Sequence, residues 1–121
     1  MNEITIRVYL NPKNDSLRES VVRVLSNEFQ KKASEITGVP IPLIYILWIT
    51  PDFTHNAPDM VVDVFFRSDQ EETGMWVEPR SRDLLGSILR ILSNGLVPLD
   101  YSFAVNVYPQ LQTSASVIYP I

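Results

Sequence analysis

The stretch Met60-Val61-Val62-Asp63-Val64-Phe65-Phe66-Arg67 decides the fold class, because its side chains alternate with the period of a β-strand. One face of this strand is wholly apolar: Met60, Val62, Val64 and Phe66. The other face carries two charges, on Asp63 and Arg67. The sequence therefore predicts a strand that buries one face in a core, whereas its charged face is not part of an ordinary apolar core.

Three more strands are predicted, two before this one in the chain and one after it. Residues 4–10 and 102–108 also alternate, whereas the nearly continuous apolar run at residues 44–50 is typical of a central strand covered on both faces. An interaction between Arg7, in the first of these strands, and Asp63 would neutralise both charges across neighbouring strands.

Two amphipathic helices are predicted between the strands, because apolar residues recur there at steps of three and four. The first helix ends at Gly38. The second has Pro79 in its first turn and covers residues 80–96. The order β-α-β-β-α-β predicts an α+β, two-layer sandwich, with residues 1–121 forming a single domain.

Composition excludes several classes of function. The 121 residues include no cysteine, one histidine, and ten Lys+Arg against fourteen Asp+Glu, for a net charge of −4. Disulfides and thiolate chemistry are excluded, and no cofactor or metal site is indicated. An acidic chain without a long apolar run predicts a cytoplasmic protein that binds neither nucleic acid nor membranes.

Three stretches resemble a known family, in the same order and at matching spacing. They are Thr37-Gly38-Val39-Pro40 leading through the apolar strand to Pro51-Asp52, the helix segment at residues 80–96, and Val97-Pro98-Leu99-Asp100 followed by Phe103-Ala104-Val105-Asn106-Val107-Tyr108. Over nearly the whole chain the pattern is similar to the macrophage migration inhibitory factor (MIF) branch of the tautomerase superfamily. The resemblance implies a double βαβ fold and a homotrimer whose sheets surround a central channel. The order of elements alone also fits a ferredoxin-like sandwich.

The resemblance also implies which chemistry to expect. Active members of that superfamily use an N-terminal proline as a general base, whereas this sequence begins Met1-Asn2-Glu3 and places Glu3 where the proline would lie. Val39 stands at the cationic position before the turn proline, and Ala104 stands at the position of a tyrosine in the last strand. Asn106 is retained. We therefore expect the proline-dependent keto-enol tautomerase activity to be absent.

Five residues are candidates for a substitute site. Glu3 is the candidate catalytic base, because burial at a subunit interface can raise a carboxylate pKa toward neutrality. Arg7 and Arg67 are candidates to bind a small carboxylate, with Asn106 and Tyr108 as further substrate-binding residues.

Other features favour simpler interpretations. His55 could pair with a neighbouring aspartate but fits a solvated loop better. The charge-free tail at residues 109–121 and the Met75-Trp76-Val77 patch are apolar enough to indicate a partner surface.

Three hypotheses about function follow from these observations. The first is a tautomerase-like homotrimer that serves as a small-molecule binding or structural protein. The second is an isomerase of small keto or enol acids that uses substitute residues, and the third is a ferredoxin-like dimeric binding module.

Overall fold

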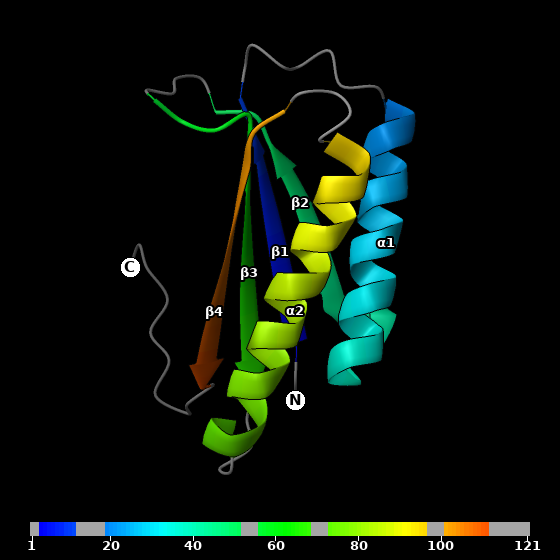
Figure 1. The fold of residues 1–121 in the computed structure, drawn as a ribbon. Helices are drawn as coiled ribbons and strands as arrows, with labels where there is room; N and C mark the ends of the chain where they lie inside the picture. Colours follow the sequence, from blue (N-terminus) through cyan, green and yellow to red (C-terminus); the bar gives the residue numbers. More distant parts are fainter. Residues whose placement is uncertain (1–2, 12–18, 52–55, 69–72, 97–100, 112–121) are drawn as a thin grey trace, which may run out of the picture.

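The computed structural model describes residues 3–11, 19–51, 56–68, 73–96 and 101–111. Its elements, in chain order, are β1 (Glu3–Leu10), α1 (Glu19–Thr37), the 3-10 turn η2 (Ile41–Leu43), β2 (Ile44–Ile49), β3 (Met60–Ser68), α2 (Thr73–Leu96) and β4 (Phe103–Leu111). The strands form a four-stranded sheet, and both helices lie on the same side of it (Figure 1). The predicted α+β two-layer arrangement is confirmed.

The pairing of the strands separates the two folds that the sequence left open. The sheet has the order β2-β1-β3-β4, with β1 parallel to β2, β3 parallel to β4, and β1 antiparallel to β3. Each helix therefore connects two neighbouring parallel strands. In the ferredoxin-like split βαβ unit a further strand lies between the connected pair. The structure thus shows the double βαβ arrangement, and the ferredoxin-like alternative is wrong.

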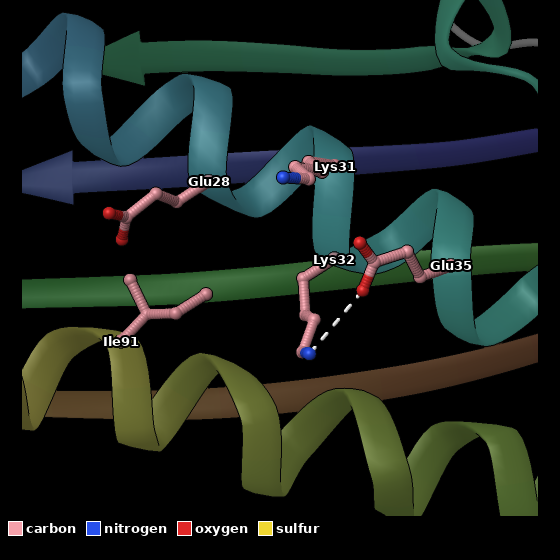
Figure 2. Close-up of a pocket in the computed structure, with 5 residues that line it drawn as sticks. All are labelled: Glu28, Lys31, Lys32, Glu35 and Ile91. Atoms are coloured by element: carbon pink, nitrogen blue, oxygen red, sulfur yellow. Dashed lines mark hydrogen bonds and ion pairs between the residues drawn. The ribbon is translucent and has the colours of Figure 1, made fainter.

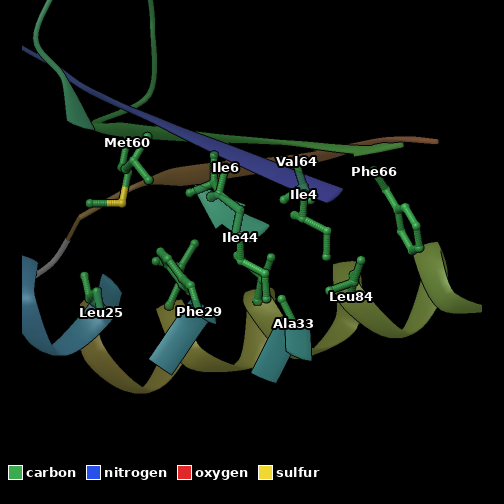
Figure 3. Close-up of a cluster of buried hydrophobic side chains, with 14 of the residues drawn as sticks. Ile4, Ile6, Leu25, Phe29, Ala33, Ile44, Met60, Val64, Phe66 and Leu84 are labelled. Carbon is green, nitrogen blue, oxygen red and sulfur yellow. The ribbon is translucent and has the colours of Figure 1, made fainter. Parts of the chain in front are cut away.

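The hydrophobic core lies between the sheet and the two helices. The alternating apolar residues of β1 and β3 are 0% exposed on this side: Ile4, Ile6, Val8, Met60, Val62, Val64 and Phe66. They pack with buried residues of the helices, among them Phe29 of α1 and Leu84 of α2 (Figure 3). The predicted apolar face of residues 60–67 is confirmed as the centre of the core.

Gly38 ends α1, as the sequence predicts. Its backbone φ is +75°, a left-handed conformation that favours glycine, and its N–H donates to the carbonyl of Ser34 at 2.8 Å. One residue earlier, the Thr37 hydroxyl donates to the carbonyl of Ala33 at 2.7 Å. The Gly38 bond satisfies the Ser34 carbonyl, one of the last four carbonyls that the helix itself leaves unpaired.

Asp59 joins the starts of β3 and β4. Its carboxylate oxygen Oδ2 accepts hydrogen bonds from the backbone N–H of Ser102 at 2.7 Å and from the Ser102 hydroxyl at 3.0 Å. The Asp59 N–H in turn donates to the Ser102 hydroxyl oxygen at 3.0 Å. This reciprocal set fixes the register in which the two parallel strands begin.

Two predictions about individual elements are wrong. The apolar strand β2 is not central: it pairs with β1 at one end of the described sheet, and Tyr45 and Leu47 are 46% and 48% exposed. The helices cover only one face of the sheet, so apolar residues on the other face of β2 remain exposed. The second helix begins at Thr73, which places Pro79 inside it. The missing N–H of Pro79 removes one helical hydrogen bond, and the helix continues through that gap.

Some predictions concern residues that the structure does not describe. His55 and the tail beyond residue 111 lie outside the described residues, as do the side chains of Met75, Trp76 and Val77. In the part that is described, no helix is both long and apolar enough to cross a membrane.

Candidate functional site

The sheet face turned away from the helices carries all five candidate residues. Strand register arranges them in rows across the sheet. One row pairs Glu3 with Arg67, the next contains Tyr45, Thr5, Phe65 and Tyr108, and a third contains Leu47, Arg7, Asp63 and Asn106. We call this surface the open face. It brings together residues from the first and last strands, as the sequence predicted from alternation.

Glu3 and Arg67 form an ion pair at one end of the open face. The distance from Glu3 Oε1 to Arg67 Nη1 is 3.3 Å, and the two side chains are 28% and 53% exposed. An exposed pair of this kind contributes little to stability, because water competes for both charges. A ligand carboxylate that binds Arg67 would have to displace Glu3 or share the guanidinium with it. Deprotonation of a substrate by Glu3 would take place beside this cation.

Phe65, in the next row of the open face, contacts both Arg7 and Tyr108. The Arg7 guanidinium carbon lies 5.0 Å from the centre of the Phe65 ring, within the range of a cation–π contact. The Phe65 and Tyr108 rings stack at 5.1 Å between centroids with 19° between their planes. Phe65 was not among the predicted site residues, although the alternation of β3 placed it on this face. It holds Arg7 and Tyr108 in one stacked group.

Asp63 binds Asn106 rather than Arg7. The register places Arg7 directly opposite Asp63, but the Asp63 carboxylate accepts a hydrogen bond from the Asn106 side-chain NH₂ at 3.0 Å, while Arg7 lies over Phe65. A carboxylate can bind only the NH₂ side of the amide, so the acceptor oxygen of Asn106 is turned away from Asp63. Asn106 is therefore suited to accept a hydrogen bond from a ligand.

A hollow of about 330 Å³ lies between α2 and β4. Ser81, Arg82 and Leu85 of α2 line it together with residues 105–108 of β4. Two of the candidate residues, Asn106 and Tyr108, are thus shared between the open face and this hollow, which we call the α2–β4 pocket. The helix residues that line it were missed at the sequence level, because only the packing of α2 against β4 brings them to the strand.

A second hollow, of about 220 Å³, lies between the two helices and is lined by Glu28, Lys31, Lys32, Glu35 and Ile91 (Figure 2). All four of its charged residues come from α1, and Lys32 pairs with Glu35 at 3.4 Å, one turn away. Such a pair is typical of a solvated helix surface. The open face and the α2–β4 pocket are therefore the stronger candidates for a functional site.

A metal site finds no support in the described part of the chain, where no group of three or more histidine, aspartate or glutamate residues converges.

Comparison with known proteins supports the fold. No family model and no curated protein sequence matches the chain. Solved structures do match: a fused 4-OT described as an asymmetric trimer has a TM-score of 0.66 at 14% identity, covering 93% of this chain and 91% of that one. The MIF-like protein EhMIF from Entamoeba histolytica has a TM-score of 0.59 at 12% identity, covering 97% and 95%.

Two further structures widen the range of activities among these neighbours. N1, a member of the cis-3-chloroacrylic acid dehalogenase family, has a TM-score of 0.62 at 16% identity and covers 95% of this chain and 80% of that one. A 5-carboxymethyl-2-hydroxymuconate delta-isomerase has a TM-score of 0.60 at 9% identity, with 98% and 87% covered. Identities this low establish shape and not activity. With the strand order β2-β1-β3-β4, they show that this chain has the fold of the tautomerase superfamily.

Proposed function

We propose that the protein is a homotrimer that binds a small carboxylate and lacks proline-dependent tautomerase activity. The observation that carries this proposal is the position of Glu3, the first residue of β1 and the predicted replacement for the catalytic proline, where it is paired with Arg67. A carboxylate held by a cation is not equivalent to the secondary amine of an N-terminal proline.

The open face supports the proposed assembly. Three large side chains on its outer strands are about half exposed: Tyr45, Leu47 and Tyr108. Apolar surface of this kind at the outer strands of a sheet is typical of an interface. In the proposed homotrimer neighbouring chains cover these residues, and the rows containing Arg7 and Asp63 line a central channel. We also propose that the chain acts as a single domain in the cytoplasm.

An assay with phenylenolpyruvate tests the proposed loss of activity. We expect the rate of ketonisation with the protein to equal the rate in buffer at every protein concentration. A rate that rises in proportion to protein concentration would contradict the proposal.

The second candidate function is an isomerase of small keto or enol acids that uses Glu3 as base. It is favoured by one observation: a carboxylate, a guanidinium and the acceptor oxygen of Asn106 all lie on one face of the sheet. If substrates of this class turn over, Glu3→Gln should abolish the activity, because the amide cannot accept the proton. Unchanged turnover in this variant would remove Glu3 as the base.

A further inference from the structure

The hydroxyl of Ser81 is a buried polar group on α2, for which the described residues provide no hydrogen-bond partner. Ser81 is 8% exposed, and its Oγ is buried and makes no hydrogen bond to any of the described residues. Leaving a hydroxyl buried and unpaired costs about 1–3 kcal/mol. Ser81 also lines the α2–β4 pocket. A serine hydroxyl turns about a single bond, so a ligand in the pocket can supply the partner that the described residues do not.

The rest of the lining indicates what kind of ligand fits. Leu85, Val105 and Val107 provide an apolar wall, and Arg82 adds a cation next to Ser81 in the sequence. Among the described residues that line the pocket there is no carboxylate, although the chain as a whole has a net charge of −4. This combination complements an anion that carries an apolar body. The volume of about 330 Å³ is at the lower end of the range for small-molecule sites.

We infer that the α2–β4 pocket binds a small monocarboxylate with an aromatic or aliphatic body. Its carboxylate accepts the hydrogen bond of the Ser81 hydroxyl and lies near Arg82, while its body packs against Leu85 and the two valines. This inference rests on the proposed small-acid binding function and gives that function a site.

The inference can be tested by NMR titration of the ¹⁵N-labelled full chain with sodium benzoate and, separately, with benzamide, which has nearly the same shape but no charge. Benzoate should shift the backbone amide signals of residues 81–85 and 105–108, and benzamide should bind at least tenfold more weakly. Equal affinity for the two probes would overturn the inferred role of the carboxylate.

Substitutions then locate the site. Leu85→Trp fills the pocket and should weaken benzoate binding at least tenfold. Ser81→Ala should weaken it several-fold while leaving the folded state as stable or more stable, because it removes an unpaired hydroxyl. Lys31→Gln, in the hollow between the helices, is the matched control and should leave binding unchanged.

Two outcomes would overturn the inference in different ways. In the first outcome benzoate binds, Arg67→Gln abolishes binding, and Leu85→Trp and Ser81→Ala do not. The ligand then occupies the open face, so the assignment of binding to the pocket is wrong and the proposed small-acid function stands. If benzoate and longer monocarboxylates such as phenylbutyrate cause no shifts, both the pocket and the small-acid function are wrong.

Discussion

The two faces of the sheet come from alternate residues of the same strands, yet they are stabilised in different ways. Beneath the helices, alternate residues of β1 and β3 are apolar and buried: Ile4, Ile6, Val8, Leu10, Met60, Val62, Val64 and Phe66. On the open face the same strands present an ion pair, a stacked group around Phe65 and an aspartate–asparagine hydrogen bond. We therefore expect the first face to determine whether the chain folds, and the second to determine what the folded chain contacts.

The largest difference is expected between two adjacent phenylalanines of β3. Phe66→Ala leaves a cavity in the core and should lower the free energy of unfolding by about 3–5 kcal/mol. Phe65→Ala removes the same atoms from the open face, where the ring is only partly buried, and should cost about 1–2 kcal/mol. Urea unfolding of both variants at low protein concentration measures the contrast, and equal losses would contradict the division between the faces.

Leu47→Glu tests whether the open face is a subunit interface. Leu47 is 48% exposed in the single chain, and burying such a side chain contributes about 1.5–3 kcal/mol. A charge at this position should therefore weaken self-association at least tenfold per interface while the far-UV circular dichroism spectrum stays unchanged. Lys31→Gln, on the helix surface, is the control. An unchanged mass for Leu47→Glu in a dilution series would exclude this part of the open face from the interface.

Asp59→Ala removes the hydrogen bonds that join the starts of β3 and β4. The Ser102 N–H then lacks its acceptor, and we expect a loss of about 1–3 kcal/mol in the free energy of unfolding. Asp59→Asn keeps one side-chain oxygen that can accept the same bond, so its loss should be smaller. If chemical unfolding shows equal losses for the two variants, the hydrogen bond to Ser102 is not the source of the stability.

Glu3→Gln should have the smallest effect on stability. The ion pair with Arg67 is solvent-exposed, and pairs of this kind contribute about 0.2–1 kcal/mol. A double-mutant cycle with Arg67→Gln isolates the coupling between the two side chains, which should decrease as salt is added. Coupling well above 1 kcal/mol that persists in high salt would mean that the pair is buried in the assembled protein.

Much of the fold follows from local patterns in the sequence. Alternation identifies both faces of β1, β3 and β4, and Gly38 marks the end of α1 because its backbone conformation favours glycine. The wrong predictions concern features that depend on contacts with other elements or chains, which the local sequence does not determine. An apolar run such as β2 is expected both for a central strand and for an outer strand that meets another subunit. Proline is favoured in the first turn of a helix, whereas Pro79 lies inside α2 at the loss of one helical hydrogen bond.

The site was less predictable than the fold. Alternation placed Arg7, Arg67, Asn106 and Tyr108 on one face, and the resemblance to the tautomerase superfamily added Glu3; the structure places all five on that face. Their partners depend on side-chain geometry: Asp63 binds an amide and not the guanidinium opposite it. The unpaired hydroxyl of Ser81 depends on tertiary packing between α2 and β4, which no periodicity in the sequence encodes.

The native mass in solution, measured by light scattering over a range of concentrations, tests the central claim that the open face and the outer strands form a subunit interface. We expect the mass of three chains at micromolar concentration, with dissociation in Leu47→Glu. A mass of one chain that does not change with concentration would contradict it, because Tyr45, Leu47 and Tyr108 would then remain exposed to water in the native protein.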